Sequence, residues 1–200
     1  MIDTFLAGAE PEVWGSDLWA PQVGTPAGAH QVCLSHQLRD LTYVAEADGP
    51  AESRWARDLR HVFGRALRLH HERDRVGPAT FARRRVLIAK ATDRLVFGPP
   101  LLPKSEARRL QRRYQQHRAS LFVFLHREDV EPTNNSSERD LRNAVIHRKV
   151  TGGYRSDWGA EASAICTSIL TTARKRGEKL FDALRSLAGP SPLQAAGIRT

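Results

Sequence analysis

The sequence predicts a mostly helical α/β protein, and three observations lead to this prediction. Two short β-prone segments lie near the beginning, at 13–16 and 30–35. Three stretches between residues 51 and 125 repeat apolar residues at the helical period, as amphipathic helices on a core do. The segment 131–154 combines a turn, a helix start and a basic strip. With 200 residues, the chain is long enough to form one domain with a substantial core.

The composition indicates a soluble and basic protein. Lys and Arg number 31 against 22 Asp and Glu, which gives a formal net charge of +9 and favours a polyanionic partner such as nucleic acid. A ribosome-associated or merely soluble basic protein would have the same charge. The two cysteines lie far apart and give no disulfide framework. No apolar run could span a membrane, and the start at Met1–Asp3 lacks the basic region of a signal peptide, so we expect a cytoplasmic protein without a membrane partner.

The first β-prone segment, Val13-Trp14-Gly15-Ser16-Asp17, predicts a strand end that runs into a turn. A carboxylate just past a strand is held rigidly and can point into a cleft, as a metal ligand must. The alternative is an ordinary turn residue, because Ser, Asp and Gly favour turns. After a Pro/Gly-rich loop at 21–29, the run His30–Ser35 predicts a short buried strand, and a helix is expected from His36.

Three residues around the second strand are of zinc-binding types, namely His30, Cys33 and His36. We expect no zinc site, because no fourth ligand is apparent and a spacing of three does not keep side chains on one face of a strand. Cys33 is expected to be a small buried apolar residue. From the residues alone, His36 and Arg39 could be residues that solvate the surface.

Three amphipathic helices are predicted next, at 51–75, at about 80–97 and from a capping Ser105 onward. Their outer faces carry many arginines, for which a solvated face is a commoner explanation than phosphate contact. The run 121–125 is apolar on all sides and is expected to be deeply buried. The residues predicted to face the core are Trp55, Leu59, Val62, Ala66, Leu69, Phe81, Ile88, Thr92, Leu95, Ala107, Leu110, Tyr114 and Leu121.

The segment 131–154 predicts a capped helix followed by a turn at Gly152-Gly153. Asn135 and Glu138 have the spacing of a capping box, with Asn in the cap role. Glu138 and Arg142 also form an i,i+4 pair. The residues alone therefore favour a structural cap over a catalytic carboxylate.

Two further helices are predicted after the glycines. Ser156 is expected to cap the first, and residues 180–187 form the second, followed by a loose tail at 189–200. The first helix carries an apolar stripe of rather small residues that suits close packing. The stripe consists of Ala160, Ala164, Ile165, Ser168, Ile169 and Thr172.

Four stretches resemble one protein family, in the same order along the chain. PTNNSSERDLR followed by RKVTGGYRS resembles the C-terminal signature of bacterial transposases of the Insertion Sequence sixty-six family, and VWGSDLWAP and HQVCLSHQLRDLTY resemble it too. These are DDE transposases, whose ribonuclease-H-like catalytic domain holds divalent metal ions with two aspartates and one glutamate. The resemblance implies that Glu138 is the final glutamate and Asp17 the second aspartate. The first aspartate has no evident counterpart.

The resemblance implies a partial ribonuclease-H-like domain with a helical insertion. Residues 1–50 would hold its C-terminal strands and first helix, 51–127 the insertion, and 128–188 the final acidic helix and the helices after it. Asp17 and Glu138 would be catalytic residues that bind Mg²⁺ or Mn²⁺, and the partners would be transposon ends, target DNA and a second copy in a homo-oligomer. The residues expected to contact DNA are Asn134, Asn135, Arg139, Arg142, Arg148 and Lys149, although helix capping would equally account for the two asparagines.

The missing aspartate limits the expected activity. Two carboxylates should bind metal weakly, so we expect a truncated transposase fragment that neither cleaves nor joins DNA by itself. One alternative is a basic helical module that binds DNA without chemistry. Another is a structural or RNA-associated basic protein whose motif match is accidental.

Overall fold

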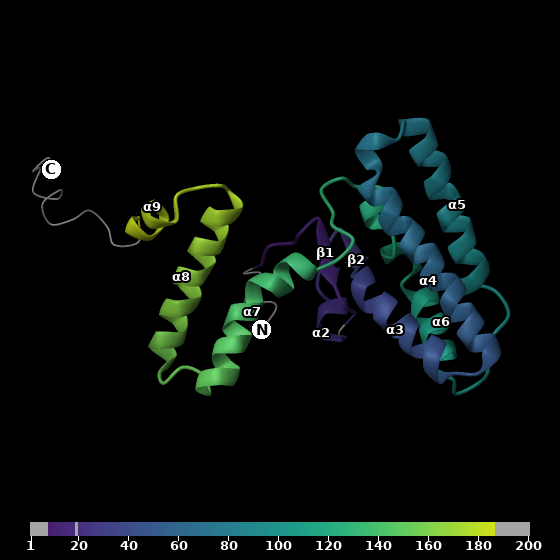
Figure 1. The fold of residues 1–200 in the computed structure, drawn as a ribbon, viewed down its shortest axis with the longest axis horizontal. Helices are drawn as coiled ribbons and strands as arrows, with labels where there is room; N and C mark the ends of the chain where they lie inside the picture. The colour runs from purple at the N-terminus through teal and green to yellow at the C-terminus, as the bar shows by residue number, and fades with distance from the viewer. Residues whose placement is uncertain (1–7, 19, 187–200) are drawn as a thin grey trace, which may run out of the picture. The chain divides into compact units, whose positions relative to one another are not determined.

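The computed structural model describes residues 8–18 and 20–186, which are mostly helical (Figure 1). The chain divides into two compact units, an N-terminal unit that ends at Asn135 and a C-terminal unit that begins at Ser136. Helices together with a small parallel sheet confirm the mostly helical α/β class. The tail predicted at 189–200 and Leu187 lie outside the described residues.

The sheet consists of two parallel strands, β1 (Val13–Ser16) and β2 (Ala29–Val32), joined by a connection that includes α2 (Ala20–Val23). The register pairs Val13 with Ala29 and Ser16 with Val32. The ladder continues by one hydrogen bond, because Cys33 N donates to Ser16 O at 2.7 Å. Both strands occur where the sequence predicts them, but β2 ends at Val32 because a helix begins at Leu34.

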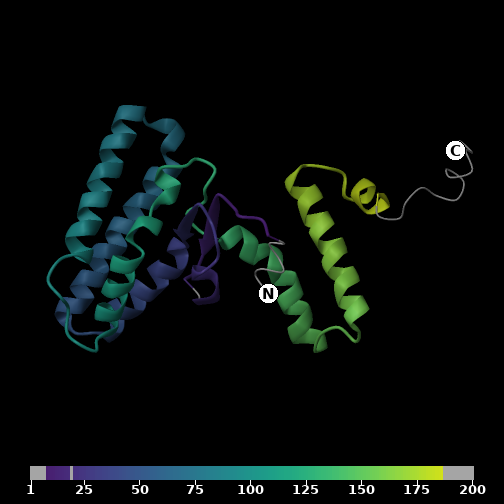
Figure 2. The same cartoon turned by 180° about the vertical axis from the view of Figure 1, so that it is seen from behind.

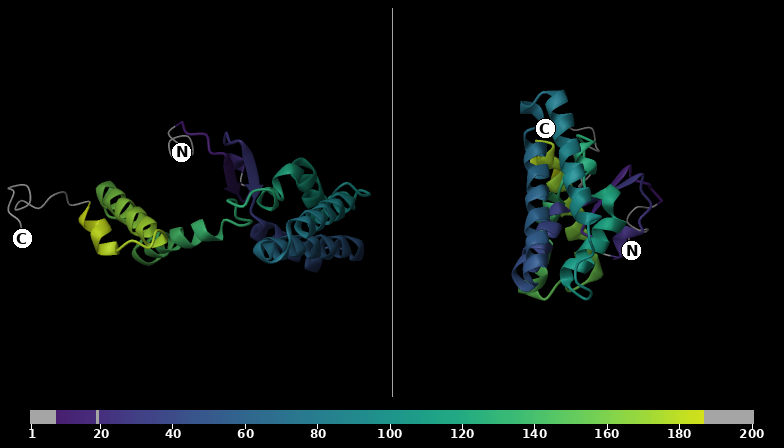
Figure 3. Two further views of the ribbon diagram at one scale, coloured as in Figure 1. Left: turned by 90° about the horizontal axis from the view of Figure 1, so that it is seen from above. Right: turned by 90° about the vertical axis from the view of Figure 1, so that its right-hand side faces the viewer.

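Four helices follow in the N-terminal unit: α3 (Leu34–Ala47), α4 (Pro50–His71), α5 (Pro78–Val96) and α6 (Glu106–Gln116). Prolines open α4 and α5, where the missing N–H costs no hydrogen bond. Ser105 caps α6 as predicted, since its Oγ accepts from Arg108 N at 3.1 Å. Helix α4 contacts α3, α5 and α6 (Figure 2). The strands lie to one side of these helices (Figure 3).

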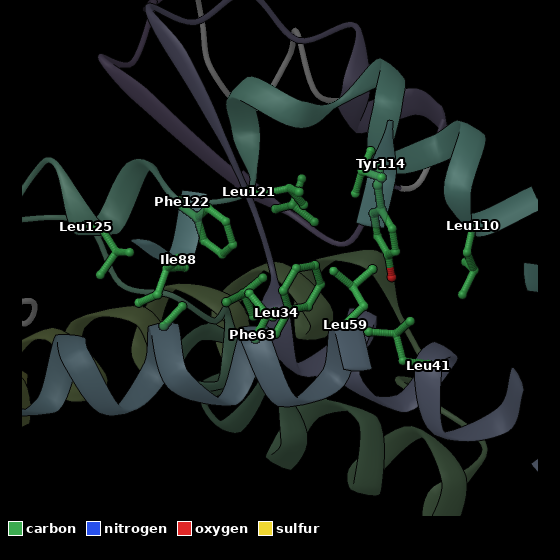
Figure 4. Packing of buried hydrophobic residues seen from close by; sticks show 14 of the residues in the cluster. Leu34, Leu41, Leu59, Phe63, Ile88, Leu110, Tyr114, Leu121, Phe122 and Leu125 are labelled. Atoms are coloured by element: carbon green, nitrogen blue, oxygen red, sulfur yellow. The ribbon is translucent and has the colours of Figure 1, made fainter. Parts of the chain in front are cut away.

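The core of this unit lies between α3, α4, α5, α6 and the segment after them (Figure 4). Phe63 meets Tyr114 and Phe122 edge to face, with ring centroids 5.6 and 5.7 Å apart. All residues predicted to face the core are buried except Leu95, which is half-buried. The run 121–125 is almost entirely buried as predicted, yet it follows the 3₁₀ turn η2 (Arg118–Ser120) and ends in a second such turn, η3 (Val123–Leu125), rather than forming the end of a helix. A straight helix would spread these apolar side chains around all sides, whereas the turns keep them on the core.

Gln31 of β2 is hydrogen-bonded to the backbone of the run 121–125. Its side chain is 2 % exposed. Its Nε2 donates to Leu121 O at 3.3 Å, and its Oε1 accepts from Phe124 N at 3.1 Å. These bonds satisfy backbone groups that neither a helix nor a strand satisfies, so a polar residue is required at this core position.

The C-terminal unit contains α7 (Asn135–Thr151), which begins on the last residue of the other unit, then α8 (Asp157–Lys175) and α9 (Leu180–Arg185). Gly152 and Gly153 form the predicted turn with φ of 77° and 111°, values that side-chain-bearing residues rarely adopt. Ser156 caps α8 as predicted, accepting from Gly159 N at 3.1 Å. The small-residue stripe is not buried: within the described residues, Ala173 is the one buried residue of α8, and Ile165 is 55 % exposed. Among the residues that the structure describes, no helix is both long and apolar enough for a membrane span.

Candidate active-site edge and cationic surfaces

Asp17 is the first residue beyond β1, as the sequence predicts. Its counterpart beyond β2 is Cys33, because Ser16 pairs with Val32 and the strands are parallel. The carboxyl ends of parallel strands share one edge of a sheet, and such edges are common ligand sites in α/β proteins. We call the surroundings of this end of the sheet, Asp17 and residues 33–36, the carboxyl edge.

The start of α3 forms the second half of the carboxyl edge. Cys33 is 2 % exposed, which agrees with the small buried residue that the sequence predicts. Its Sγ lies 3.2 Å from Nδ1 of the half-buried His36. The sulfur therefore has a polar neighbour within the fold, and the imidazole is held close to the end of the sheet.

The segment 132–135 docks on the carboxyl edge from a hundred residues further along the chain. Leu34 N donates to Pro132 O at 3.0 Å, and Asn134 N donates to Cys33 Sγ at 3.4 Å. Asn135 Nδ2 donates to Ser35 Oγ at 3.1 Å. The first residues of the PTNN motif are therefore fixed against the HQVCLS stretch, which sequence spacing alone does not indicate.

The start of α7 differs from the predicted capping box. Asn135 is the first residue of the helix, and its side-chain amide is used on Ser35. The Oδ1 of the preceding residue, Asn134, is buried without a hydrogen-bond partner among the described residues. The predicted cap residue is thus the first residue of the helix, and a difference of one position is common at helix ends. Glu138 follows three residues after Asn135, within the first turns of α7.

The predicted phosphate contacts lie on α7. With a helical period of 3.6 residues, Glu138, Arg142 and Lys149 lie on one face of this helix, and Arg139 and Arg148 flank that face. All five side chains are exposed. The other acid of α7, Asp140, is paired with Lys175 of α8. One face of α7 therefore carries a carboxylate near its start and cations along its length.

Within 8–18 and 20–186, no three His, Cys, Asp or Glu side chains lie close enough together to hold a metal ion. Asp17 belongs to the N-terminal unit and Glu138 to the C-terminal unit. Both supply carboxylate oxygens, which Mg²⁺ and Mn²⁺ prefer.

A surface hollow lined by Leu18, the residue after Asp17, is a feature that the sequence prediction missed. It is lined by Leu18, by Lys104 and by arginines of α6, including Arg112. Leu18 and Lys104 have φ of 69° and 71°, in the left-handed region that residues other than glycine rarely adopt. The i,i+4 spacing of the α6 arginines was visible in the sequence, but nothing there could place them around one hollow with Leu18.

Comparison with known proteins supports one family. Residues 1–162 match the transposase IS66 family, a span that includes Asp17, the carboxyl edge and all of α7. No curated protein and no solved structure matches the chain significantly.

Proposed function

Because this chain belongs to the transposase IS66 family, we propose that Asp17 and Glu138 are two of the carboxylates with which the family holds divalent metal ions for DNA transposition. The family supports transposition as the biological process and DNA as the partner. The assignment of individual residues is our proposal, and it includes a ribonuclease-H-like origin for the small parallel sheet and the role of an insertion for the helices at 51–127.

The observation that carries this proposal is the convergence on the carboxyl edge. Asp17 directly follows β1, and the PTNN motif that leads into α7 is hydrogen-bonded to Cys33 and Ser35 at the same end of the sheet. Two stretches that resemble the family and lie more than a hundred residues apart therefore come to the same end of the sheet within the N-terminal unit. A mere helix cap would require no such contact with the end of a sheet.

The donor chemistry of Asp17 and Glu138 fits Mg²⁺ or Mn²⁺, although two carboxylates are fewer than the three of the family. When bound, two such ions stabilise the attacking and leaving oxygens of phosphoryl transfer. We therefore propose that residues 1–200 alone bind metal weakly and neither cleave nor join DNA. Robust metal-dependent strand transfer by this chain would contradict that proposal.

DNA would be held by α7 in this proposal. Arg142 and Lys149 share a face with Glu138, so phosphates bound by these cations would run towards the carboxylate. Arg139 and Arg148 would extend the contact on either side. Phosphate contacts of this kind give affinity and register rather than sequence reading. Asn134 and Asn135 would mainly position the start of α7, with DNA contact as a second role.

A non-catalytic DNA-binding module is the second candidate function. It is favoured by the net charge of +9. The two candidates differ in what they assign to Glu138. Only the transposase assignment links this carboxylate to metal ions.

The test is fluorescence anisotropy with a labelled random-sequence DNA duplex, with and without Mg²⁺. Arg142→Glu combined with Lys149→Glu should weaken binding more than Arg174→Glu combined with Lys179→Glu, which changes the charge equally outside α7. Added salt by itself weakens DNA binding. For the wild type, Mg²⁺ should instead raise the affinity for the duplex relative to a monovalent salt of equal ionic strength, because a metal ion can bridge a carboxylate and a phosphate. Glu138→Gln should remove that gain.

Each outcome separates the candidates. A Mg²⁺ gain that survives Glu138→Gln, or no gain at all, would favour the non-catalytic module. Wild-type protein that binds no duplex would contradict both. The homo-oligomer and the cytoplasmic location follow only from the family and its DNA partner, and they stay predictions.

A further inference from the structure

A second cationic surface lies in the N-terminal unit, between α3 and α4. It is a hollow of about 700 Å³, which we call the α3–α4 hollow. Its cations come from both helices, and no acidic side chain lines it. The lining residues are Leu38, Arg39, Thr42, Arg57, Arg60, His61, Gly64 and Arg68.

The arginines of this hollow have no acidic partners among the residues that the structure describes. Arg39, Arg57, Arg60 and Arg68 are exposed, and none of them forms an ion pair with any residue in the described ranges. Other arginines of the same unit do have such partners: Arg73 with Glu128, Arg84 with Glu72, Arg113 with Asp40 and Arg118 with Asp93. Four uncompensated positive charges around one hollow create a local field that attracts an anion.

The spacing of the arginines suits a nucleic acid backbone better than a single small anion. Arg57, Arg60 and Arg68 follow one face of α4, and the first and last are eleven residues apart. At 1.5 Å per residue they extend over about 16 Å of helix. Successive phosphates of one DNA strand advance by about 3.4 Å along the duplex axis, so this row extends over about five base pairs.

Gly64 lies among these arginines in the middle of α4. An added Cβ there would meet only Arg68 Nη1, at 3.8 Å, so no packing contact requires a glycine. A glycine inside a helix costs stability relative to alanine. What it offers is helix backbone without a side chain in the lining of the hollow, where a ligand backbone can approach closely.

The α3–α4 hollow is also connected to the carboxyl edge. His36 lies at that edge, and Arg39 is one helical turn further along α3. A duplex that follows α3 would therefore pass from the surroundings of Asp17 to the arginines of α4 without leaving the N-terminal unit.

We propose that the α3–α4 hollow binds the phosphate backbone of duplex DNA, as a contact surface separate from α7. The inference rests on the proposed function in one respect, namely that DNA is the partner. It assigns to the predicted insertion a share of DNA binding that the sequence treats as ordinary surface solvation.

The test compares two variants of equal net charge. Arg57→Gln combined with Arg60→Gln removes two charges from the hollow, and Arg83→Gln combined with Arg94→Gln removes two exposed charges of α5 in the same unit. Affinity for a labelled random-sequence duplex is measured from about 50 to 200 mM salt. Each lost phosphate contact lowers the log–log salt slope by about 0.9, so the hollow variant should lose about 1.8 from the slope. Between about 50 and 200 mM salt, the fold-loss in affinity should therefore be about twelve times smaller for the hollow variant than for the wild type.

A third variant removes no charge. Gly64→Leu adds a large side chain to the lining of the hollow and keeps every arginine. It should weaken duplex binding relative to Gly64→Ala. Equal slopes for the hollow variant and its control would overturn the inference, and so would wild-type affinity of Gly64→Leu. If the wild type itself bound no duplex, the proposed function would fail as well, so the two failures are distinguishable.

Discussion

Replacing Gln31 with leucine should destabilise the N-terminal unit strongly. Gln31 is buried, and its side chain accepts from Phe124 N and donates to Leu121 O. Leucine has a similar size but would leave both backbone groups buried without these partners. Each group left unsatisfied costs about 1–3 kcal/mol, so the expected loss in the free energy of unfolding is about 2–6 kcal/mol. The apolar gain from the leucine offsets about 1 kcal/mol of this.

Gln37 provides the matched control for this substitution. It is fully buried in α3, and neither its Oε1 nor its Nε2 has a hydrogen-bond partner among the described residues. The same change to leucine removes two unsatisfied polar atoms and leaves no new ones. Gln37→Leu should therefore be neutral or stabilise the unit by up to about 3 kcal/mol.

Urea denaturation followed by tryptophan fluorescence measures both variants. Trp55 is 7 % exposed in the core of the N-terminal unit, so its emission reports on the unfolding of this unit. The two variants should move the midpoint in opposite directions, or Gln37→Leu should leave it unchanged. Similar destabilisation by both would refute the reasoning, because it would mean that the hydrogen bonds of Gln31 to Leu121 and Phe124 are not what makes an amide necessary there.

Three further predictions concern two glycines and one histidine. Gly64→Ala should stabilise α4 by about 0.5–1 kcal/mol in the same urea titration, because alanine has the higher helix propensity; a loss of stability would show that the glycine is needed for the fold. Gly153→Ala should cost about 1–3 kcal/mol, since φ of 111° is strained for any side chain, and hydrogen exchange of α7 and α8 amides should accelerate; unchanged protection would contradict this. Burial lowers the pKa of His70 below its ordinary value near 6.5, with Arg73 and His71 adding to the effect and Glu131 opposing it. The unfolded chain then binds the proton more readily, so this contribution to stability is present above about pH 6.5 and is lost as the pH falls towards the lower pKa of the folded state. His70→Phe should flatten the pH dependence of the urea midpoint in this window, and an identical profile would count against the assignment.

Most of the helical architecture was predictable from sequence because its signals are local. Trp55, Leu59, Val62 and Ala66 repeat at the helical period, and all are buried on α4. The caps at Ser105 and Ser156 are single side chains that satisfy nearby backbone groups, so their position is readable without the fold. The end of β2 was less predictable, because the preference for strand at Cys33–Ser35 is overridden by the start of α3.

The candidate site was predictable only in part. Asp17 was recognisable as a residue just past a strand, and Glu138 as one near a helix start. The docking of Asn134 and Asn135 on Cys33 and Ser35 joins positions about a hundred residues apart, and no local pattern encodes such a contact. Likewise, the arginines of α4 looked like a solvated helix face. Their convergence with Arg39 around one hollow depends on how α3 packs against α4.

The most direct test of Asp17 and Glu138 as partners in one metal site is a Mn²⁺ titration followed by electron paramagnetic resonance of the free ion. The proteins compared are the wild type, Asp17→Asn, Glu138→Gln, the double variant, and Glu161→Gln as a control that removes an exposed carboxylate from α8. If the two carboxylates hold one ion, each single variant should lose nearly as much Mn²⁺ binding as the double variant, because their contributions are coupled. Strictly additive losses, or losses no larger than that of Glu161→Gln, would contradict a shared metal site.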